Sequence, residues 1–276
     1  MRWLISWVGG PAGYVNPNKE ATVINENCVV GMMNLFKGQQ QKGLHYHSVT
    51  EIYVILKGNL ESYDGNGEKT YAGPMDCIYI PKGVPHGVRN CGDDDCELIW
   101  VHDGIEKIGT SVYFMDGVVT GGYTQEEDIS MVRFTDLKQN ISAPLCAQEG
   151  YVRWMLNWVA GPSSPQQGQQ QKYVNYSQGF AVESEKVDIG MTVLKPKQAA
   201  PLQQSGLGCT YLVMSGSATF MSKDKQRQQK LTRLDGAWVP KGTPHKVVNS
   251  GEDDLYLMWV HEFADEAASL KYLENE

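Results

Sequence analysis

Three histidines and one glutamate in the first third of the chain have the types and spacing of a metal-ligand set. His45, His47 and Glu51 share one parity, so on extended backbone their side chains point to the same face. His86 follows a rigid Pro-Lys-Gly-Val-Pro turn that can bring a third imidazole to the same place. Imidazoles with one carboxylate suit a divalent transition-metal ion. The spacing therefore predicts one metal site, in which Glu51 is either a fourth ligand or a catalytic base.

Short β-strands are the elements that must position these side chains. Residues 52–56 form a near-continuous apolar run, and residues 77–80 and 98–101 form two more. The sequence Asp-Gly-Asn-Gly at 64–67 is typical of a hairpin turn, and Pro81 ends the run before it. Short, regular strands with glycine and proline between them predict an all-β antiparallel sandwich or barrel.

An internal repeat divides the chain into two copies of this arrangement. The matching segments are 2–11 with 153–162, 81–86 with 240–245, and 100–102 with 259–261. Self-similarity of this kind indicates duplicated structural units.

The repeat sets the predicted boundaries of the parts of the chain. We expect a metal-binding N-terminal barrel over 1–110 and a connector over 111–150. A second barrel with a degenerate metal site is expected over 151–265, followed by a short C-terminal helix over 266–276.

The ligand motifs resemble those of the cupins. The first motif is His45-x-His47-x₃-Glu51-x₆-Gly58. The second is Pro81-x-Gly83-x₂-His86-x₃-Asn90, although Met75 stands where the family has a glycine shortly before it. The resemblance covers both halves and implies tandem duplicated cupin (jelly-roll) β-barrels. In the second half, residues 202–209 contain no His or Glu, which predicts a barrel without a metal ion.

The resemblance implies an enzyme with one divalent metal ion per chain, with Fe²⁺ favoured and Mn²⁺, Zn²⁺, Ni²⁺ or Co²⁺ as alternatives. Its leading implication is a non-haem iron dioxygenase acting on a small oxygen-rich substrate such as an enol, diketone or phenol. One alternative is a non-oxidative isomerase, lyase or decarboxylase. A further alternative is a non-catalytic small-molecule-binding or storage protein. Many proteins with two such barrels dimerise, so a homodimer is one option for this chain.

Three other side chains are candidates for the wall of a substrate pocket. Tyr53 shares the inward parity of Glu51. Arg89 lies just beyond His86 and could hold a substrate anion. His102 recurs in the second half as His261, which favours a structural role, with a substrate-facing role as the alternative.

The composition excludes several classes of partner. The net charge of −8 and a pI near 5.3 argue against a nucleic-acid or anionic-membrane surface. No apolar run approaches the roughly 18 residues that a membrane-spanning helix needs. The first residues recur in mid-chain, so they are interpreted as structure and not as a targeting signal, and we expect a cytoplasmic protein.

Overall fold

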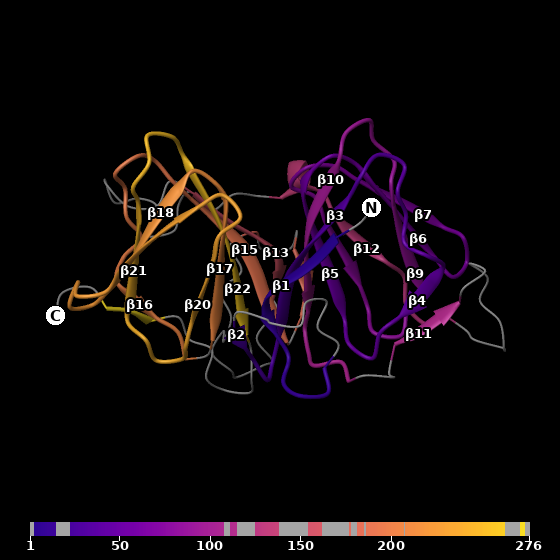
Figure 1. Ribbon diagram of the computed structural model, residues 1–276, viewed down its shortest axis with the longest axis horizontal. Helices are drawn as coiled ribbons and strands as arrows, with labels where there is room; N and C mark the ends of the chain where they lie inside the picture. Colours follow the sequence, from indigo (N-terminus) through magenta and orange to yellow (C-terminus); the bar gives the residue numbers. More distant parts are fainter. Residues whose placement is uncertain are drawn as a thin grey trace, which may run out of the picture. The chain divides into compact units, whose positions relative to one another are not determined.

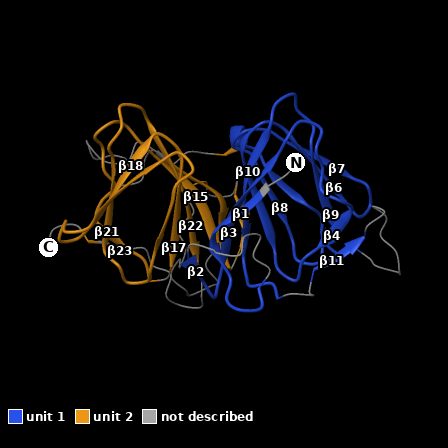
Figure 2. Ribbon diagram, in the orientation of Figure 1, with its two compact units in different colours: residues 1–136 blue, residues 137–276 orange. Residues whose placement is uncertain are grey.

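The structure is a computed structural model that describes residues 3–14, 23–107, 111–114, 125–137, 154–161, 177, 181–184, 186–206, 208–262 and 271–273. The chain divides into two compact units, Met1–Asp136 and Leu137–Glu276 (Figure 2). Both units are built of β-strands, as predicted, and η1 (Phe134–Asp136) is the helical element among the described residues (Figure 1). None of these residues belongs to a helix long and apolar enough to cross a membrane.

The first unit consists of two sheets that share one core. One sheet has the strand order β12-β8-β5-β10-β3-β1-β2 and the other β11-β4-β9-β6-β7. Apolar side chains from both sheets, such as Tyr53 and Leu98 from the first and Leu60 and Val88 from the second, form one buried cluster. The strands are β1 (Trp3–Gly9), β2 (Val23–Ile24), β3 (Val29–Leu35), β4 (Leu44–Tyr46), β5 (Glu51–Lys57), β6 (Leu60–Asp64), β7 (Lys69–Ala72), β8 (Cys77–Ile80), β9 (His86–Asn90), β10 (Cys96–His102), β11 (Val112–Phe114) and β12 (Ser130–Val132).

The second unit repeats this plan with its own core. Its sheets have the orders β14-β13-β15-β22-β17-β20 and β19-β18-β21-β16-β23. Tyr211 and Leu257 from one sheet pack with Phe220 and Val247 from the other. The strands are β13 (Trp154–Ala160), β14 (Val182–Glu183), β15 (Val187–Leu194), β16 (Gln203–Gln204), β17 (Cys209–Ser215), β18 (Ser217–Ser222), β19 (Gln228–Thr232), β20 (Gly236–Val239), β21 (His245–Asn249), β22 (Leu255–Glu262) and β23 (Lys271–Tyr272).

Two segments differ from the parts expected along the sequence. The described residues of the predicted connector add two strands to the first unit, because β11 pairs with β4 and β12 pairs with β8. The predicted C-terminal helix is wrong for the residues that are described, since Lys271 and Tyr272 form strand β23 and pair with Gln204 and Gln203. The rest of that expected helix lies outside the described residues. Strand pairing with an open sheet edge outweighs the helix propensity of this short segment.

Met75 occupies a backbone position that favours glycine. Its φ angle is 73°, in the left-handed region that side chains other than glycine rarely adopt. The residue precedes Cys77–Ile80, the strand that leads into the Pro81 turn. The backbone turn expected from the motif is therefore present, and a methionine occupies it at some cost in strain.

Gly31 explains one part of the internal repeat. A methyl group at this position would collide with the indole ring of Trp100 and the backbone oxygen of Ile5, and Gly190 stands in the same relation to Trp259. We expect Gly31→Ala to lower the free energy of unfolding by about 1–3 kcal/mol, because the added carbon overpacks a closed core. Urea unfolding measures the change. Gly73→Ala is the control, since its added carbon meets nothing closer than 3.5 Å. Equal stabilities of the two variants would contradict the packing argument.

Candidate metal centre

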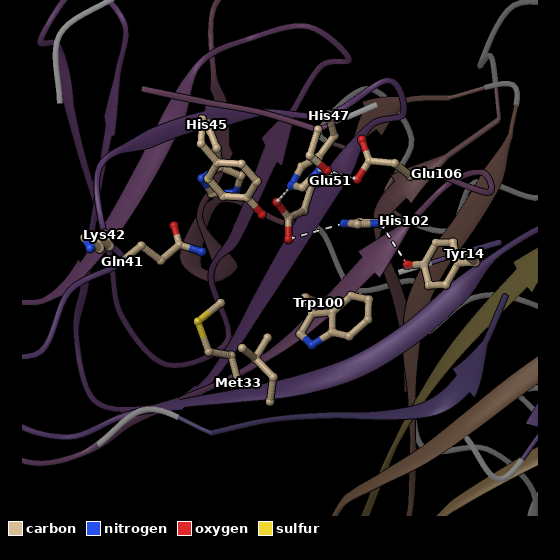
Figure 3. A pocket seen from close by; sticks show the side chains of 13 residues that line it. Tyr14, Met33, Gln41, Lys42, His45, His47, Glu51, Trp100, His102 and Glu106 are labelled. Carbon is tan, nitrogen blue, oxygen red and sulfur yellow. Dashed lines mark hydrogen bonds and ion pairs between the residues drawn. The ribbon is translucent and has the colours of Figure 1, made fainter. Parts of the chain in front are cut away.

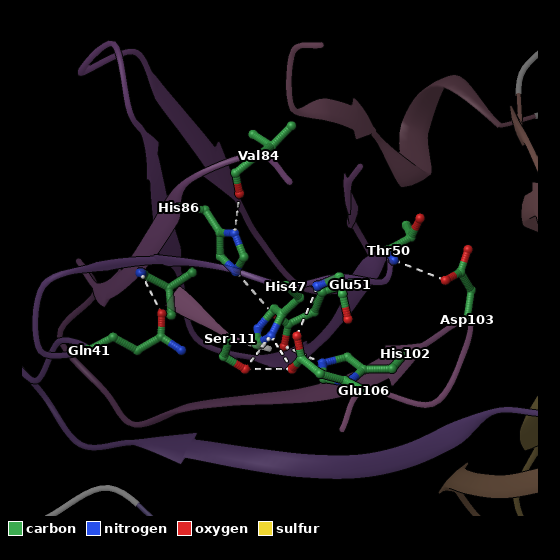
Figure 4. Close-up of polar contacts among 12 residues, drawn as sticks. Gln41, His47, Thr50, Glu51, Val84, His86, His102, Asp103, Glu106 and Ser111 are labelled. Carbon is green, nitrogen blue, oxygen red and sulfur yellow. Dashed lines mark hydrogen bonds and ion pairs between the residues drawn. The ribbon is translucent and has the colours of Figure 1, made fainter. Parts of the chain in front are cut away.

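The four predicted ligands lie together in the first unit. His45 on β4 pairs across the sheet with His86 on β9, and Glu51 is the first residue of β5. One donor atom from each of His45, His47, Glu51 and His86 lies within 4.8 Å of the others, and all four side chains are buried (Figures 3 and 4). Among the described residues, this is the group of His, Cys, Asp and Glu side chains that is compact enough to hold an ion.

The orientation of His86 fits a metal ion. Its Nδ1 lies 2.9 Å from the carbonyl oxygen of Val84, which can only accept, so Nδ1 carries the proton. In the neutral ring, Nε2 then presents a lone pair 2.9 Å from Oε2 of Glu51. Two acceptors facing each other at this distance require a cation between them, either a proton or a metal ion. The donor set of three imidazoles and one carboxylate is chemically suited to the latter.

Glu106 fixes the orientation of His47. Its Oε2 lies 2.6 Å from Nδ1 of His47, while Nε2 of the same ring faces Glu51 at 3.0 Å. Ser111 Oγ also donates to the Glu106 carboxylate, at 2.7 Å (Figure 4), and the Ser48 backbone N–H donates to it at 2.9 Å. A carboxylate behind a ligating imidazole fixes its tautomer and makes it a better donor. Glu106 therefore belongs to the site, although no motif pointed to it.

A sequence signal for Glu106 did exist. An acidic residue follows the repeated Trp-Val-His segment by four positions in both halves, as Glu106 and as Asp265. Asp265 lies outside the described residues. An acidic residue at the same position in both repeats was therefore a candidate for the site that the sequence alone could have indicated.

Charges within the cluster shift the pKa values of its members. Burial alone would raise the pKa of Glu51, but the neighbouring His47, His102 and His86 outweigh it and hold this pKa well below its usual range. Burial would lower the pKa of His47, but Glu51 and Glu106 raise it to about 10. Burial, followed by repulsion from His86, keeps the pKa of His45 well below its usual range. Near neutral pH in the metal-free protein, the His45 ring is therefore neutral, whereas the His47 ring is cationic with a proton on each nitrogen.

The raised pKa of His47 predicts how metal affinity depends on pH. A metal ion must displace the His47 proton, which the metal-free protein releases only near a pKa of about 10. The apparent affinity for Mn²⁺ should therefore rise by about tenfold per pH unit between about pH 7 and 9, with about one proton released per ion. Calorimetry in buffers of different ionisation enthalpy measures this release. Binding without proton release would contradict the assigned protonation of His47.

His102 connects Glu51 to Tyr14. His102 Nε2 lies 3.5 Å from Oε1 of Glu51, and its Nδ1 lies 3.1 Å from the Tyr14 hydroxyl (Figure 3). An ionised carboxylate only accepts, so Nε2–H donates to Glu51 and the Tyr14 hydroxyl donates to Nδ1. Burial and the charge of Glu51 raise the pKa of Tyr14, which keeps its proton in place. His102, whose counterpart in the second half is His261, thus holds the Glu51 carboxylate in place.

A cavity of about 450 Å³ opens beside the cluster. Figure 3 shows Met33 and Trp100 on an apolar side of it and His45, His47 and Glu51, three of the four predicted ligands, on a polar side. Leu4 is a further apolar lining residue. The full lining set is Leu4, Tyr14, Met33, Gln41, Lys42, His45, His47, Glu51, Trp100, His102, Glu106, Ser111 and Tyr113. A partly apolar hollow with convergent polar groups is typical of a small-molecule site.

Of the three residues predicted to line a substrate pocket, only His102 lies in the wall of this cavity. Tyr53 has the inward parity that was predicted, but it is fully buried in the core with its ring 6.5 Å from that of His86. Arg89 has the opposite parity to His86 on β9, and it donates to Glu61 at 2.6 Å. The structure therefore places both side chains away from this cavity: parity selects a face, but depth within the barrel decides whether a side chain reaches the cavity.

The second unit has other side chains at the equivalent strand positions. Gln203 pairs with His245 as His45 pairs with His86, and Cys209 faces His261 as Glu51 faces His102. Gln203 donates to the Tyr211 hydroxyl at 2.7 Å, and that hydroxyl lies 2.8 Å from Nε2 of His245. These hydrogen bonds give Nε2 of His245 a partner within the second unit.

Comparisons with known proteins agree with this geometry. Residues 31–102 match the cupin domain family. The chain carries tandem cupin barrels. A search of curated proteins finds no relative. Among solved structures, a variant of oxalate decarboxylase from Bacillus subtilis is similar in fold, with a TM-score of 0.62 and 17% identity over 90% of this chain and 72% of that one.

Two further structures of the same Bacillus subtilis enzyme resemble these cupin barrels. One comes from work on its Mn(II) centres and covers 72% of that chain, and the other is the enzyme at pH 4.6 and covers 70%. Both have a TM-score of 0.59 and 17% identity over 90% of this chain. At this identity the likeness concerns the fold.

Proposed function

We propose that this tandem cupin is a metal-dependent enzyme that breaks a carbon–carbon bond in a small oxygen-rich organic acid without net consumption of O₂, as a decarboxylase or lyase. The observation that carries the proposal is the compact, buried set of three imidazoles and one carboxylate in the wall of a cavity. A structural ion is fully enclosed by its ligands, whereas a catalytic one keeps a position open toward a cavity. Similarity of fold to oxalate decarboxylase supports the non-oxidative reaction class.

Each residue of the site has a distinct task in this proposal. His45, His47, Glu51 and His86 would hold the ion, which when bound supplies a Lewis acid for a carboxylate or carbonyl oxygen. Glu106 keeps Nε2 of His47 directed at the ion. His102 lines the cavity beside Glu51 and holds a proton at Nε2 that faces the reacting region. Leu4, Met33 and Trp100 keep water from one side of the cavity.

The structurally similar decarboxylase guides the choice of the ion. Mn²⁺ is the ion to test first, because the Mn(II) centres of the structurally similar decarboxylase show that this fold can hold it. Fe²⁺ is the ion to test second.

A dioxygenase is the second candidate. The apolar side of the cavity favours a dioxygenase, since Leu4, Met33 and Trp100 form an apolar surface that the small apolar molecule O₂ can contact. In that case Fe²⁺ is the expected ion, and the substrate is an enol, diketone or phenol.

The test is to measure product and O₂ together. The protein is loaded with Mn²⁺ or Fe²⁺ and incubated with oxalate, 2-oxo acids and 2-hydroxy acids, with an oxygen electrode and detection of CO₂. Release of CO₂ without net O₂ uptake is the expected result. One O₂ consumed per product would overturn the proposal in favour of the dioxygenase. Metal-loaded protein that binds these acids without turnover would leave a binding protein as the better account.

A further inference from the structure

The side-chain amide of Gln41 presents a fixed donor to the cavity beside the metal centre. Gln41 is 7% exposed and lines this cavity. Its Oε1 accepts a hydrogen bond from the backbone N–H of Val88 at 3.1 Å (Figure 4). Because a backbone N–H can only donate, this bond decides which end of the amide is oxygen and which is nitrogen. Figure 3 shows the nitrogen, Nε2, turned toward the space between His45 and Met33.

Nε2 of Gln41 is both unpaired and accessible. It makes no hydrogen bond to the described part of the chain, and it is not among the buried side-chain atoms that solvent cannot reach. Neighbouring donors in the wall are already engaged, since the Tyr14 hydroxyl donates to His102 and the Ser111 hydroxyl to Glu106. The Gln41 amide is therefore a donor that an acceptor within the cavity can bind.

The second barrel shows that the fold does not require this side chain. Ala200 is the counterpart of Gln41 in the repeat. The backbone N–H of Gln41 donates to the carbonyl of Val88, and that of Ala200 donates to the carbonyl of Val247, at 2.8 Å in both barrels. Ala200 is packed in the apolar core of its barrel. The amide thus replaces a methyl group in the barrel that has the metal-ligand cluster.

The strand register places the amide one step along the barrel from the ligands. His45 pairs with His86, and Gln41 bonds to Val88, two residues further along β9. Residues two apart on a strand share a face and lie about 7 Å apart. This separation fits a molecule that carries a second oxygen several carbon atoms beyond the acid group at the metal centre. It favours a longer acid over oxalate, whose oxygens lie on two adjacent carbon atoms.

We propose that Gln41 is a specificity-determining residue whose Nε2 donates to a second oxygen of the substrate, beyond the acid group at the metal centre. The substrate class is then a 2-oxo or 2-hydroxy acid with a carbonyl, hydroxyl or carboxylate oxygen about three carbon atoms further along its chain. A site that donates to one substrate atom rejects a molecule with a methyl group there, because the covered donor has lost water and gained no partner. The acid group at the metal end rests on the proposed function, whereas the donor of Gln41 does not.

The experiment compares two probes that differ in one acceptor. 2,5-Dioxohexanoate and 5-methyl-2-oxohexanoate have the same 2-oxo acid group, the same charge and nearly the same shape, but the second has a methyl group in place of the remote carbonyl oxygen. Lys42 also lines the cavity, and its attraction for the acid group cancels between probes of equal charge. Their dissociation constants are measured by calorimetry on Mn²⁺-loaded protein.

Four proteins are compared: wild type, Gln41→Ala, Gln41→Met and the control Gln39→Ala. Gln41→Ala installs the residue type that the second barrel has at this place. Gln41→Met keeps the volume of the side chain, so it carries the test if the smaller residue loosens the barrel. Gln39 is a matched control because its Oε1 also accepts from a backbone N–H, that of Phe36 at 3.0 Å, and it does not line the cavity.

The expected result is a loss of preference and not only of affinity. Wild type should bind 2,5-dioxohexanoate about tenfold more tightly than 5-methyl-2-oxohexanoate, which is the usual effect of one buried hydrogen bond. This ratio should fall to near one in both Gln41 variants and stay at the wild-type value in Gln39→Ala. A merely structural role of Gln41 would weaken both probes alike and leave the ratio unchanged. An unchanged ratio in both Gln41 variants, an equal fall in Gln39→Ala, or no binding of either probe to wild type at millimolar concentration would overturn the inference.

Turnover is measured separately on the same samples. A ratio that shifts as expected without any CO₂ release would keep the Gln41 inference and reject the proposed function. CO₂ release with an unchanged ratio would do the reverse.

Discussion

Replacing His86 with alanine is expected to abolish stoichiometric metal binding, whereas His245→Ala should leave it at one equivalent per chain. His86 is fixed by its bond to the Val84 carbonyl and directs Nε2 at Glu51, so the substitution removes one imidazole donor from the ligand set. Removing a direct ligand should lower the affinity by more than the roughly 10–100-fold that follows loss of a residue behind a ligand. Elemental analysis and Mn²⁺ titration of the purified proteins measure both quantities.

His245→Ala is a matched control because it removes the equivalent histidine from the second barrel. His245 bonds to the Thr243 carbonyl as His86 does to that of Val84, but its Nε2 contacts the Tyr211 hydroxyl and not a carboxylate. Circular dichroism must show that both variants are folded. If His245→Ala also loses the ion, or if wild type binds two ions, the assignment of one site to the first barrel is wrong.

The fold and the cluster were predictable because they depend on local patterns. Alternating parity brings His45, His47 and Glu51 to one face, and the turn before His86 sets the register that places it opposite His45. These patterns are encoded within a few residues of one another. The second barrel follows from the internal repeat, in which the turn before His86 returns before His245.

The wall of the cavity was not predictable in the same way, because it depends on long-range packing. Tyr14 contacts His102 from 88 residues away in the sequence. Glu106 contacts His47 from 59 residues away. Arg89, adjacent to the second motif, is turned to the other face of its strand. Proximity in sequence to a ligand is thus a weak guide to the residues around it.

The two barrels illustrate how one scaffold holds two different polar clusters. Tyr211 in the second barrel closes a network with Gln203 and His245, which leaves no acceptor pair that needs a cation. In the first barrel, Glu51 faces the imidazoles of His47 and His86 at 3.0 and 2.9 Å. The carboxylate therefore decides which barrel can hold an ion.

Glu106→Gln is expected to weaken Mn²⁺ binding by about 10–100-fold while leaving the stoichiometry at one. The amide oxygen can still accept from Nδ1 of His47, but it lacks the charge that makes the imidazole a stronger donor and that raises the His47 pKa. Ser111→Ala is the control, because it removes one bond to Glu106 and keeps the carboxylate, so a change of less than about tenfold is expected. The pH profile separates this role from a merely structural one: with a lower His47 pKa, the variant should release less than one proton per ion near neutral pH. An unchanged affinity and an unchanged proton release in Glu106→Gln would mean that the His47 ring is held by packing alone.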